Sequence, residues 1–161
     1  MRRFVQVVLL LSAAAWIGGC ESNGTQPGDR TQPAQPVYIY YQVTGLDVGL
    51  DQPTARVVRD QNELGAIGSP TLNRVVIDFS TRSLVLLTPG RCPTGGYWVQ
   101  ITAIEQQGNR LTIHGIANAP GPDEMVTQAI TYPYAAAVID KTDAGEVSMR
   151  VDSVRGEEPP E

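Results

Sequence analysis

Residues 97–117, YWVQITAIEQQGNRLTIHGIA, predict two strands joined by a tight turn. Apolar or small residues recur at every second position in both halves, with mostly polar residues between them. They are Tyr97, Val99, Ile101 and Ala103, then Leu111, Ile113, Gly115 and Ala117. Such an alternation places successive side chains on opposite faces of a strand. The turn falls at Gln107-Gly108-Asn109, where glycine and asparagine favour a reversal of the chain. We therefore expect an antiparallel hairpin with one face in the core.

Short apolar runs separated by turn residues predict further strands on both sides of this hairpin. They are residues 37–44, 55–59, 75–79, 84–87, 134–140 and 146–152, the last two as a pair around the turn at 142–145, with Val147, Met149 and Val151 facing the core. Asp60, with Glu63 three positions later, predicts the start of a short helix. About seven short strands and one short helix favour an all-β fold, a mostly antiparallel sandwich or barrel.

The first 20 residues have the pattern of a bacterial lipoprotein signal peptide. Two arginines precede a mostly apolar run, residues 4–17, which is shorter than the roughly 20 residues that a membrane-spanning helix needs. The run ends at Ile-Gly-Gly-Cys20, which resembles a lipobox, in which the cysteine is lipidated and becomes the first residue of the mature protein. The alternative is an ordinary signal peptide with an incidental cysteine. We expect a protein of the bacterial cell envelope, lipid-anchored to a membrane through Cys20, on the periplasmic face or the cell surface.

Composition divides the remaining chain into three parts. Residues 21–36 contain no aliphatic side chain larger than alanine and are expected to form a disordered tether. Residues 155–161 are expected to form a short acidic, disordered tail. Residues 37–154 between them are long enough for one β-rich domain that folds without disulfide bonds. If Cys20 is lipidated, Cys92 is left as a single thiol.

The charge of the chain argues against nucleic acid as a partner. The net charge is −5, from 12 basic and 17 acidic side chains, and Lys141 is the single lysine. Binding to phosphate backbones needs clustered lysine and arginine side chains, whereas the arginines here are scattered. An acidic protein surface is also not attracted to anionic lipids, so we expect the lipid on Cys20 alone to hold the protein at the membrane.

Residues with the chemistry for catalysis or metal binding are scarce. His114 is the only histidine. A dyad of Cys92 and His114 would need the two side chains in contact and a lowered thiol pKa, so a strand position for His114 and a packed Cys92 are the simpler interpretation. The sequence has no nucleophile elbow, phosphate-binding loop or zinc-ligand spacing. We expect no enzyme, no cofactor and no metal.

One loop segment differs in composition from the rest of the chain. Its sequence, Arg91-Cys-Pro-Thr-Gly-Gly-Tyr-Trp98, combines a proline and two adjacent glycines with two large aromatic residues. Proline and glycine restrict or widen backbone angles in ways that shape a turn. One interpretation is a tight connection in which Tyr97 packs into the core. The other is a protein-binding loop anchored by Trp98, because Trp, Tyr and Arg are enriched at binding hot spots.

Three motifs make the chain similar to the C-terminal domain of the PrcB family, subunits of a bacterial protease complex. They are Val76-Ile-Asp-Phe-Ser80, Arg91-Cys-Pro-Thr-Gly-Gly-Tyr97 and Thr131-Tyr-Pro-Tyr134, and the similarity runs from about Val75 to Lys141. The resemblance implies a surface lipoprotein or envelope subunit that associates with a protease and supports or localises it without being a protease. The expected partner is an exported protease or another envelope protein. The expected contact residues are Arg91, Pro93, Thr94, Gly95, Gly96, Tyr97 and Trp98, with Tyr132, Pro133 and Tyr134 if that turn lies alongside.

The same loop is also similar to an inhibitory loop of chagasin-type cysteine-protease inhibitors, which reads Asn-Pro-Thr-Thr-Gly-Tyr with a Trp one residue further on. Here Cys92 replaces the asparagine, Gly95 replaces the second threonine, and Trp98 follows Tyr97 directly. A second inhibitory loop should be rich in glycine, but residues 119–123 contain one. The third inhibitory loop of that family reads Arg-Pro-aromatic, and Tyr132-Pro133-Tyr134 is only loosely similar to it. A protease inhibitor that uses the loop from Pro93 to Trp98 is therefore the alternative function.

Overall fold

The computed structural model describes residues 32–156, and it contains the hairpin that the sequence predicted. Strands β5 (Trp98–Gln107) and β6 (Arg110–Ala119) pair antiparallel, from Trp98 opposite Asn118 to Gln107 opposite Arg110. Gly108, in the two-residue turn between them, has a φ of +55°. Glycine adopts this left-handed conformation without steric cost, as the first turn position of many tight hairpins requires.

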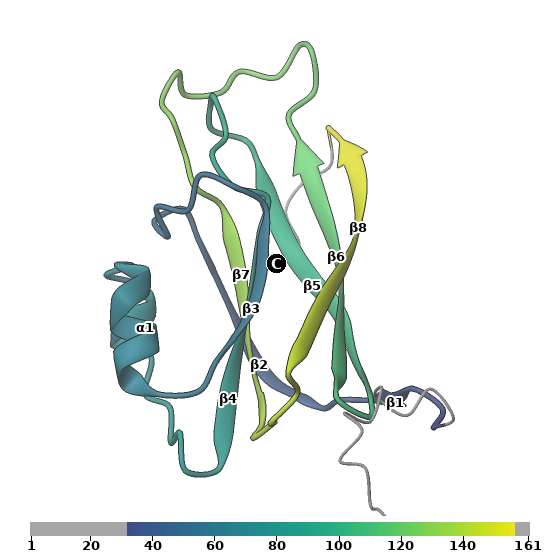
Figure 1. The fold of residues 1–161 in the computed structure, drawn as a ribbon. Coiled ribbons are helices and arrows are strands. Elements are labelled where there is room, and N and C mark those ends of the chain that lie inside the picture. Colours follow the sequence, from purple (N-terminus) through teal and green to yellow (C-terminus); the bar gives the residue numbers. More distant parts are fainter. Residues whose placement is uncertain (1–31, 157–161) are drawn as a thin grey trace, which may run out of the picture.

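The strands of residues 32–156 form two four-stranded sheets that pack face to face (Figure 1). Sheet A has the order β1-β5-β6-β8, with β1 at Gln35–Pro36 and β8 at Glu146–Arg155. Sheet B has the order β2-β7-β4-β3, formed by Ile39–Gly45, Tyr134–Asp140, Arg82–Thr88 and Thr54–Val58. Neighbouring strands are antiparallel except β6 and β8, which are parallel. The predicted all-β sandwich with one short helix is confirmed.

The central strands of sheet B, β4 and β7, are buried on both faces of the sheet. One face packs against sheet A around Val85, Leu87 and Ile139. The other packs against helix α1 (Gln61–Ile67), which lies beside it in Figure 1, and against the 3-10 helix η1 (Leu72–Arg74). Its central strands β4 and β7 are therefore almost continuously apolar, as is typical of strands without a solvent-facing side.

Helix α1 begins where the sequence predicted. The carboxylate of Asp60 accepts hydrogen bonds from the backbone N–H groups of Asn62 and Glu63, both at 2.8 Å. These bonds satisfy two of the free N–H groups at the start of the helix. The apolar side chains of Leu64 and Ile67 lie against sheet B. Capping and burial therefore both stabilise this short helix.

The prediction of a strand at residues 75–79 is wrong. These residues follow η1 and lie outside both sheets. Alternate side chains of the segment pack against the helical side of sheet B, whereas Val76 between them is 93% exposed. The alternation is thus real, but it comes from an extended segment crossing an apolar surface without a neighbouring strand.

The predicted pairing of the last two strands is also wrong. β7 belongs to sheet B, and β8 crosses to sheet A, where it lies parallel to β6. Val147 and Val151 are half-buried, but Met149 is 40% exposed. The predicted inward face is therefore only partly covered, because β8 lies at the edge of its sheet.

The prediction that Ala103 faces the core is wrong, because β5 contains a β-bulge. The register with β6 shifts between Ile101 and Ala103. Ile104 is consequently 2% exposed in the core, while Ala103 is exposed. An extra residue in one strand reverses the side-chain phase beyond it.

The ends of the ordered domain differ slightly from the predicted boundaries of 37 and 154. β1 pairs Gln35 and Pro36 with β5, and β8 extends to Arg155. The predicted signal peptide, Cys20, most of the tether and most of the tail lie outside the described residues. Within residues 32–156, the helices have neither the length nor the hydropathy of a membrane span.

Candidate functional site

The predicted loop connects β4 to β5 at one end of the sandwich, and we call residues 91–98 the aromatic loop. The long connection between β6 and β7, residues 120–133, lies beside it at the same end (Figure 1). Cys92 and Thr131 exchange two backbone hydrogen bonds, of 2.8 and 3.0 Å. Gly95 donates a third, of 2.9 Å, to the carbonyl of Thr127. The two loops therefore form one hydrogen-bonded unit.

The connection between β2 and β3 holds this unit from another side. The backbone N–H of Arg91 donates to the carbonyl of Asp51 at 3.2 Å. Tyr132 donates in the same way to Leu46 at 3.3 Å. Three loops far apart in the sequence thus support one another, and the aromatic loop has a fixed shape.

The paired glycines let two of these loops approach closely. Gly96 has a φ of +79°, and a Cβ there would lie 2.6 Å from Cγ1 of Val126 and 3.0 Å from Cβ of Pro120. A Cβ at Gly95 would collide with the side chain of Thr127. A larger residue at Gly95 would have to displace the side chain of Thr127, and one at Gly96 would have to displace the side chains of Val126 and Pro120.

The predicted contact residues differ in exposure. Arg91, Pro93 and Gly96 are exposed; Thr94, Tyr97, Trp98 and Tyr132 are half-buried; Gly95, Pro133 and Tyr134 are buried. The turn at 131–134 does lie alongside the aromatic loop, as the Cys92–Thr131 bridge shows. Of the three contact residues expected in that turn, Tyr132 alone reaches the surface.

Tyr134 is a core residue. It is 1% exposed, and its ring packs so closely against the backbone of Gly45 that a Cβ there would lie 2.6 Å away. Burial raises the pKa of its hydroxyl, and the nearby carboxylate of Asp47 raises it further. The phenol therefore stays neutral inside the fold, and Tyr134 and Pro133 leave the set of surface contacts.

Trp98 lies on the outer face of sheet A. It precedes Val99, whose side chain is in the core, and pairs in register with Asn118. The Nδ2 group of Asn118 donates to the carbonyl of Gly96 at 3.4 Å, which links β6 to the aromatic loop. Tyr97 and Trp98 are both half-buried, so part of each residue faces solvent at this end of the sandwich.

Three exposed apolar residues at this end were missed by the sequence analysis. Leu46, Met125 and Ile130 are 52%, 100% and 50% exposed, respectively. They come from the two connections that hold the aromatic loop. Single exposed apolar side chains are common on protein surfaces, so these three add to the site only through their place on the loops that hold the aromatic loop. Met125 and Ile130 lie in a short, mostly polar connection beside Val126 and Ala129, and this gives no sign in the sequence that they are exposed.

Cys92 and His114 have separate surroundings. Cys92 is 5% exposed, its thiol lies 3.8 Å from the carbonyl of Gly90, and burial raises the pKa of the thiol. Nε2 of His114 instead lies 3.4 Å from a carboxylate oxygen of Glu105. The buried neutral thiol is a packing group, since reactive cysteines need a lowered pKa. Across residues 32–156, no group of three or more His, Cys, Asp or Glu side chains could hold a metal ion.

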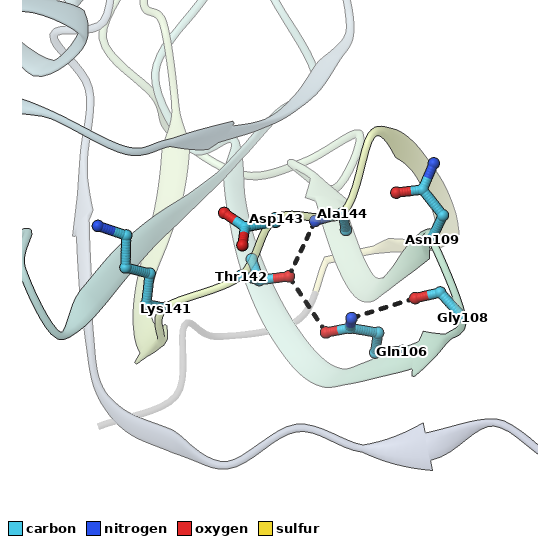
Figure 2. A pocket seen from close by; sticks show the side chains of 7 residues that line it. All are labelled: Gln106, Gly108, Asn109, Lys141, Thr142, Asp143 and Ala144. Carbon is cyan, nitrogen blue, oxygen red and sulfur yellow. Dashed lines mark hydrogen bonds between the residues drawn. The ribbon is translucent and has the colours of Figure 1, made fainter.

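A polar hollow lies at the other end of the hairpin, beside the β7–β8 connection (Figure 2). Its polar groups bond to one another: Thr142 donates from Oγ1 to Oε1 of Gln106 at 3.1 Å and accepts from the N–H of Ala144 at 3.2 Å. Oδ1 of Asn109 accepts from the N–H of Gly145 at 2.7 Å. These bonds brace the chain where it crosses from sheet B to sheet A, so the hollow has a structural role.

A comparison with protein families gave a match, and the matched segment contains the aromatic loop. The family model described as PrcB C-terminal matches residues 83–140. The comparisons with curated proteins and with solved structures gave no match. The matched residues include the two central strands of each sheet, the aromatic loop and the β6–β7 connection. The motif at 76–80 lies outside them.

The edge strands β1, β2, β3 and β8 and helix α1 surround this matched region without being part of it. The PrcB family is an accessory family related to a protease complex. Residues 83–140 are therefore similar to the PrcB C-terminal family, and the resemblance that the motifs indicated is confirmed over this segment.

Proposed function

We propose that this chain is a lipid-anchored accessory subunit of the bacterial cell envelope, which binds an exported protease through the aromatic loop and does not itself catalyse a reaction. The observation that carries the proposal is the match of residues 83–140 to the PrcB C-terminal family. The matched region contains the loop unit with its exposed and half-buried aromatic and apolar side chains. The proposed contacts are Arg91, Pro93, Thr94, Gly96, Tyr97, Trp98 and Tyr132.

The geometry of the loop unit suits protein binding. The backbone hydrogen bonds to Thr127 and Thr131 hold the aromatic loop in place before a partner arrives. A loop that is already ordered loses less conformational entropy on association. Partly exposed tyrosine and tryptophan rings supply large apolar contact areas, and Arg91 adds a donor at the rim.

Replacement of Trp98 with alanine is expected to weaken partner binding about tenfold, a difference of about 1.4 kcal/mol, because it removes the largest ring of the loop. The measurement is crosslinking in intact cells, followed by mass spectrometry and quantification of the captured protease. Val76→Ala is the matched control, since Val76 is 93% exposed and lies outside the loop unit. Equal recovery of the protease with Trp98→Ala and with the wild type, both folded by circular dichroism, would contradict the proposal.

The same capture separates an accessory subunit from an inhibitor. An accessory subunit copurifies with a protease that stays active. A chagasin-like inhibitor instead blocks a cysteine or serine protease when residues 21–161 are added in solution, and Trp98→Ala relieves the block. The placement of residues 119–123 beside Gly96 favours testing this second function, although the burial of Pro133 and Tyr134 leaves a third inhibitory loop with one surface ring.

Cys20→Ala is expected to accumulate as unprocessed precursor and to lose lipid attachment. The motif Ile-Gly-Gly-Cys20 supports this proposal. Each CH₂ group of an acyl chain contributes about 0.8 kcal/mol of membrane affinity, so two or more chains give stable anchoring. Gel mobility and membrane fractionation, with and without globomycin, measure the effect. Normal processing and membrane retention of the variant would refute lipidation.

A further inference from the structure

Strand β8 is the least protected of the sheet edges in residues 32–156. An edge strand presents free N–H and C=O groups to other chains, and proteins guard such edges by making them short, bulged, charged or interrupted by proline, or by covering them. β1 has two residues including Pro36, β2 carries a bulge, and β3 has five residues directly after Pro53. β8 instead has ten residues, contains neither proline nor glycine, and pairs with β6 without a register shift. It offers a long, regular template for another strand.

The two faces of β8 differ in character. Val147 and Val151 pack against the core between the sheets. Met149 lies on the same face, 40% exposed, beside an apolar pocket that Leu87 and Val99 also line. The outer face carries Arg150 and Asp152, both exposed. When two copies of such a strand lie antiparallel, the positive charge of each copy can lie opposite the negative charge of the other.

We propose that β8 joins two copies of this chain edge to edge, antiparallel, with the two-fold axis at Val151. Residues directly opposite each other on antiparallel strands share a face, so this register keeps the apolar face continuous. It places Arg150 of each copy opposite Asp152 of the other. Registers centred on Arg150 or on Asp152 would instead place identical charges opposite each other, which destabilises a strand pair.

A second copy fits this edge better than an unrelated strand does. The charge pattern of β8 matches its own reverse, so one surface supplies both halves of the interface, as a two-fold dimer requires. Sheet A would become a continuous eight-stranded sheet made from two copies of its four strands. The same contact would cover Met149 and extend the apolar surface around the pocket beside it.

The test measures the mass of residues 21–161, which include every described strand, by light scattering and sedimentation from micromolar to millimolar concentration. The wild type is expected to have twice the monomer mass and to dissociate more readily in high salt. Arg150→Asp and Asp152→Arg, each alone, are expected to be monomers because they place like charges opposite each other. The double variant Arg150→Asp/Asp152→Arg and an equimolar mixture of the two single variants are both expected to restore the dimer.

A cysteine crosslink tests the register. Opposed residues on antiparallel strands have Cα atoms about 4.5–5.5 Å apart, within the range that a disulfide bridges. Val151→Cys is therefore expected to form a covalent dimer on mild oxidation, whereas Val147→Cys, which would face Arg155 of the second copy, is not. A wild type that stays monomeric at millimolar concentration, or single charge variants that dimerise like the wild type, would overturn the proposal. If a charge variant fails to fold by circular dichroism, the two cysteine variants distinguish the dimer from the monomer.

Because β8 and the aromatic loop are separate parts of the surface, we expect dimer formation and protease binding to be independent of each other. Trp98→Ala is expected to leave the dimer intact, and Arg150→Asp is expected to keep the loop-dependent capture. Loss of both properties together would reveal a fold defect instead.

Discussion

Replacement of Leu86 with alanine is expected to lower the free energy of unfolding by about 2–5 kcal/mol. Leu86 is fully buried, with 0% exposure, in the cluster between sheet B and the helical layer. Its neighbours on β3 and β7 are held by strand hydrogen bonds on both sides. The truncated side chain therefore leaves a cavity that the strands cannot close. Urea unfolding of residues 21–161, followed by circular dichroism, measures the change.

Val76→Ala is the control for this variant. Val76 is 93% exposed, so its truncation is expected to change the free energy of unfolding by less than about 0.5 kcal/mol. A domain of this size has a total stability of roughly 5–15 kcal/mol, so the loss at Leu86 is a large share of it. Equal effects of the two substitutions would show that α1 and η1 do not form a packed layer on sheet B.

Local physical rules account for the parts of the fold that the sequence predicted well. The hairpin of β5 and β6 follows from its alternation and its glycine-containing turn, and α1 follows from the capping by Asp60. Both signals act between residues close in the chain. The correct class, a two-sheet sandwich, needed only the number and length of such short elements.

Long-range choices account for the errors. Nothing in residues 146–155 says whether that strand pairs with β7, its neighbour in sequence, or with β6 in the other sheet. The crossing is braced by the bonds from Thr142 to Gln106 and from Gly145 to Asn109. The segment at 75–79 alternates as a strand would, because it crosses an apolar surface. In both places the sequence pattern indicated which side chains face the core, but it did not indicate which strand, if any, lies next to the segment.

In the candidate site, too, local features could be predicted from the sequence and long-range contacts could not. Proline and paired glycines predicted that the aromatic loop is shaped, and its geometry follows from those residues. Its supports, Asp51 and Thr127, have no signal in the sequence, since their role is to present backbone carbonyls. Tyr132 and Tyr134 could not be told apart as surface and core residues, because only the position of β7 between two packed faces buries Tyr134.

Gly90→Ala is expected to lower the free energy of unfolding by about 2–4 kcal/mol, because it combines backbone strain with a collision. Gly90 has a φ of +89°, and a Cβ there would lie 2.6 Å from the carbonyl oxygen of Asp51 and 2.8 Å from the carbonyl carbon of Gln52. These are backbone atoms, which cannot rotate away as the end of a side chain can. The alanine would therefore have to separate the β4–β5 connection from the β2–β3 connection.

Gly49→Ala separates the two causes. Gly49 also has a positive φ, of +60°, but a Cβ there would meet nothing within 4 Å. Its substitution is expected to cost about 1–2 kcal/mol from backbone strain alone. Urea unfolding of both variants thus isolates the collision as their difference, and equal losses would refute a close contact at Gly90.

The same pair of variants links the scaffold to binding. Arg91 follows Gly90 and begins the aromatic loop with its hydrogen bond to Asp51, the residue that the new Cβ would strike. Gly90→Ala is therefore expected to reduce capture of the protease even at temperatures where the domain remains folded. Gly49→Ala, which leaves that bond in place, is expected to keep capture at the wild-type level. A folded Gly90→Ala variant with full capture would show that binding does not depend on how the loop is held.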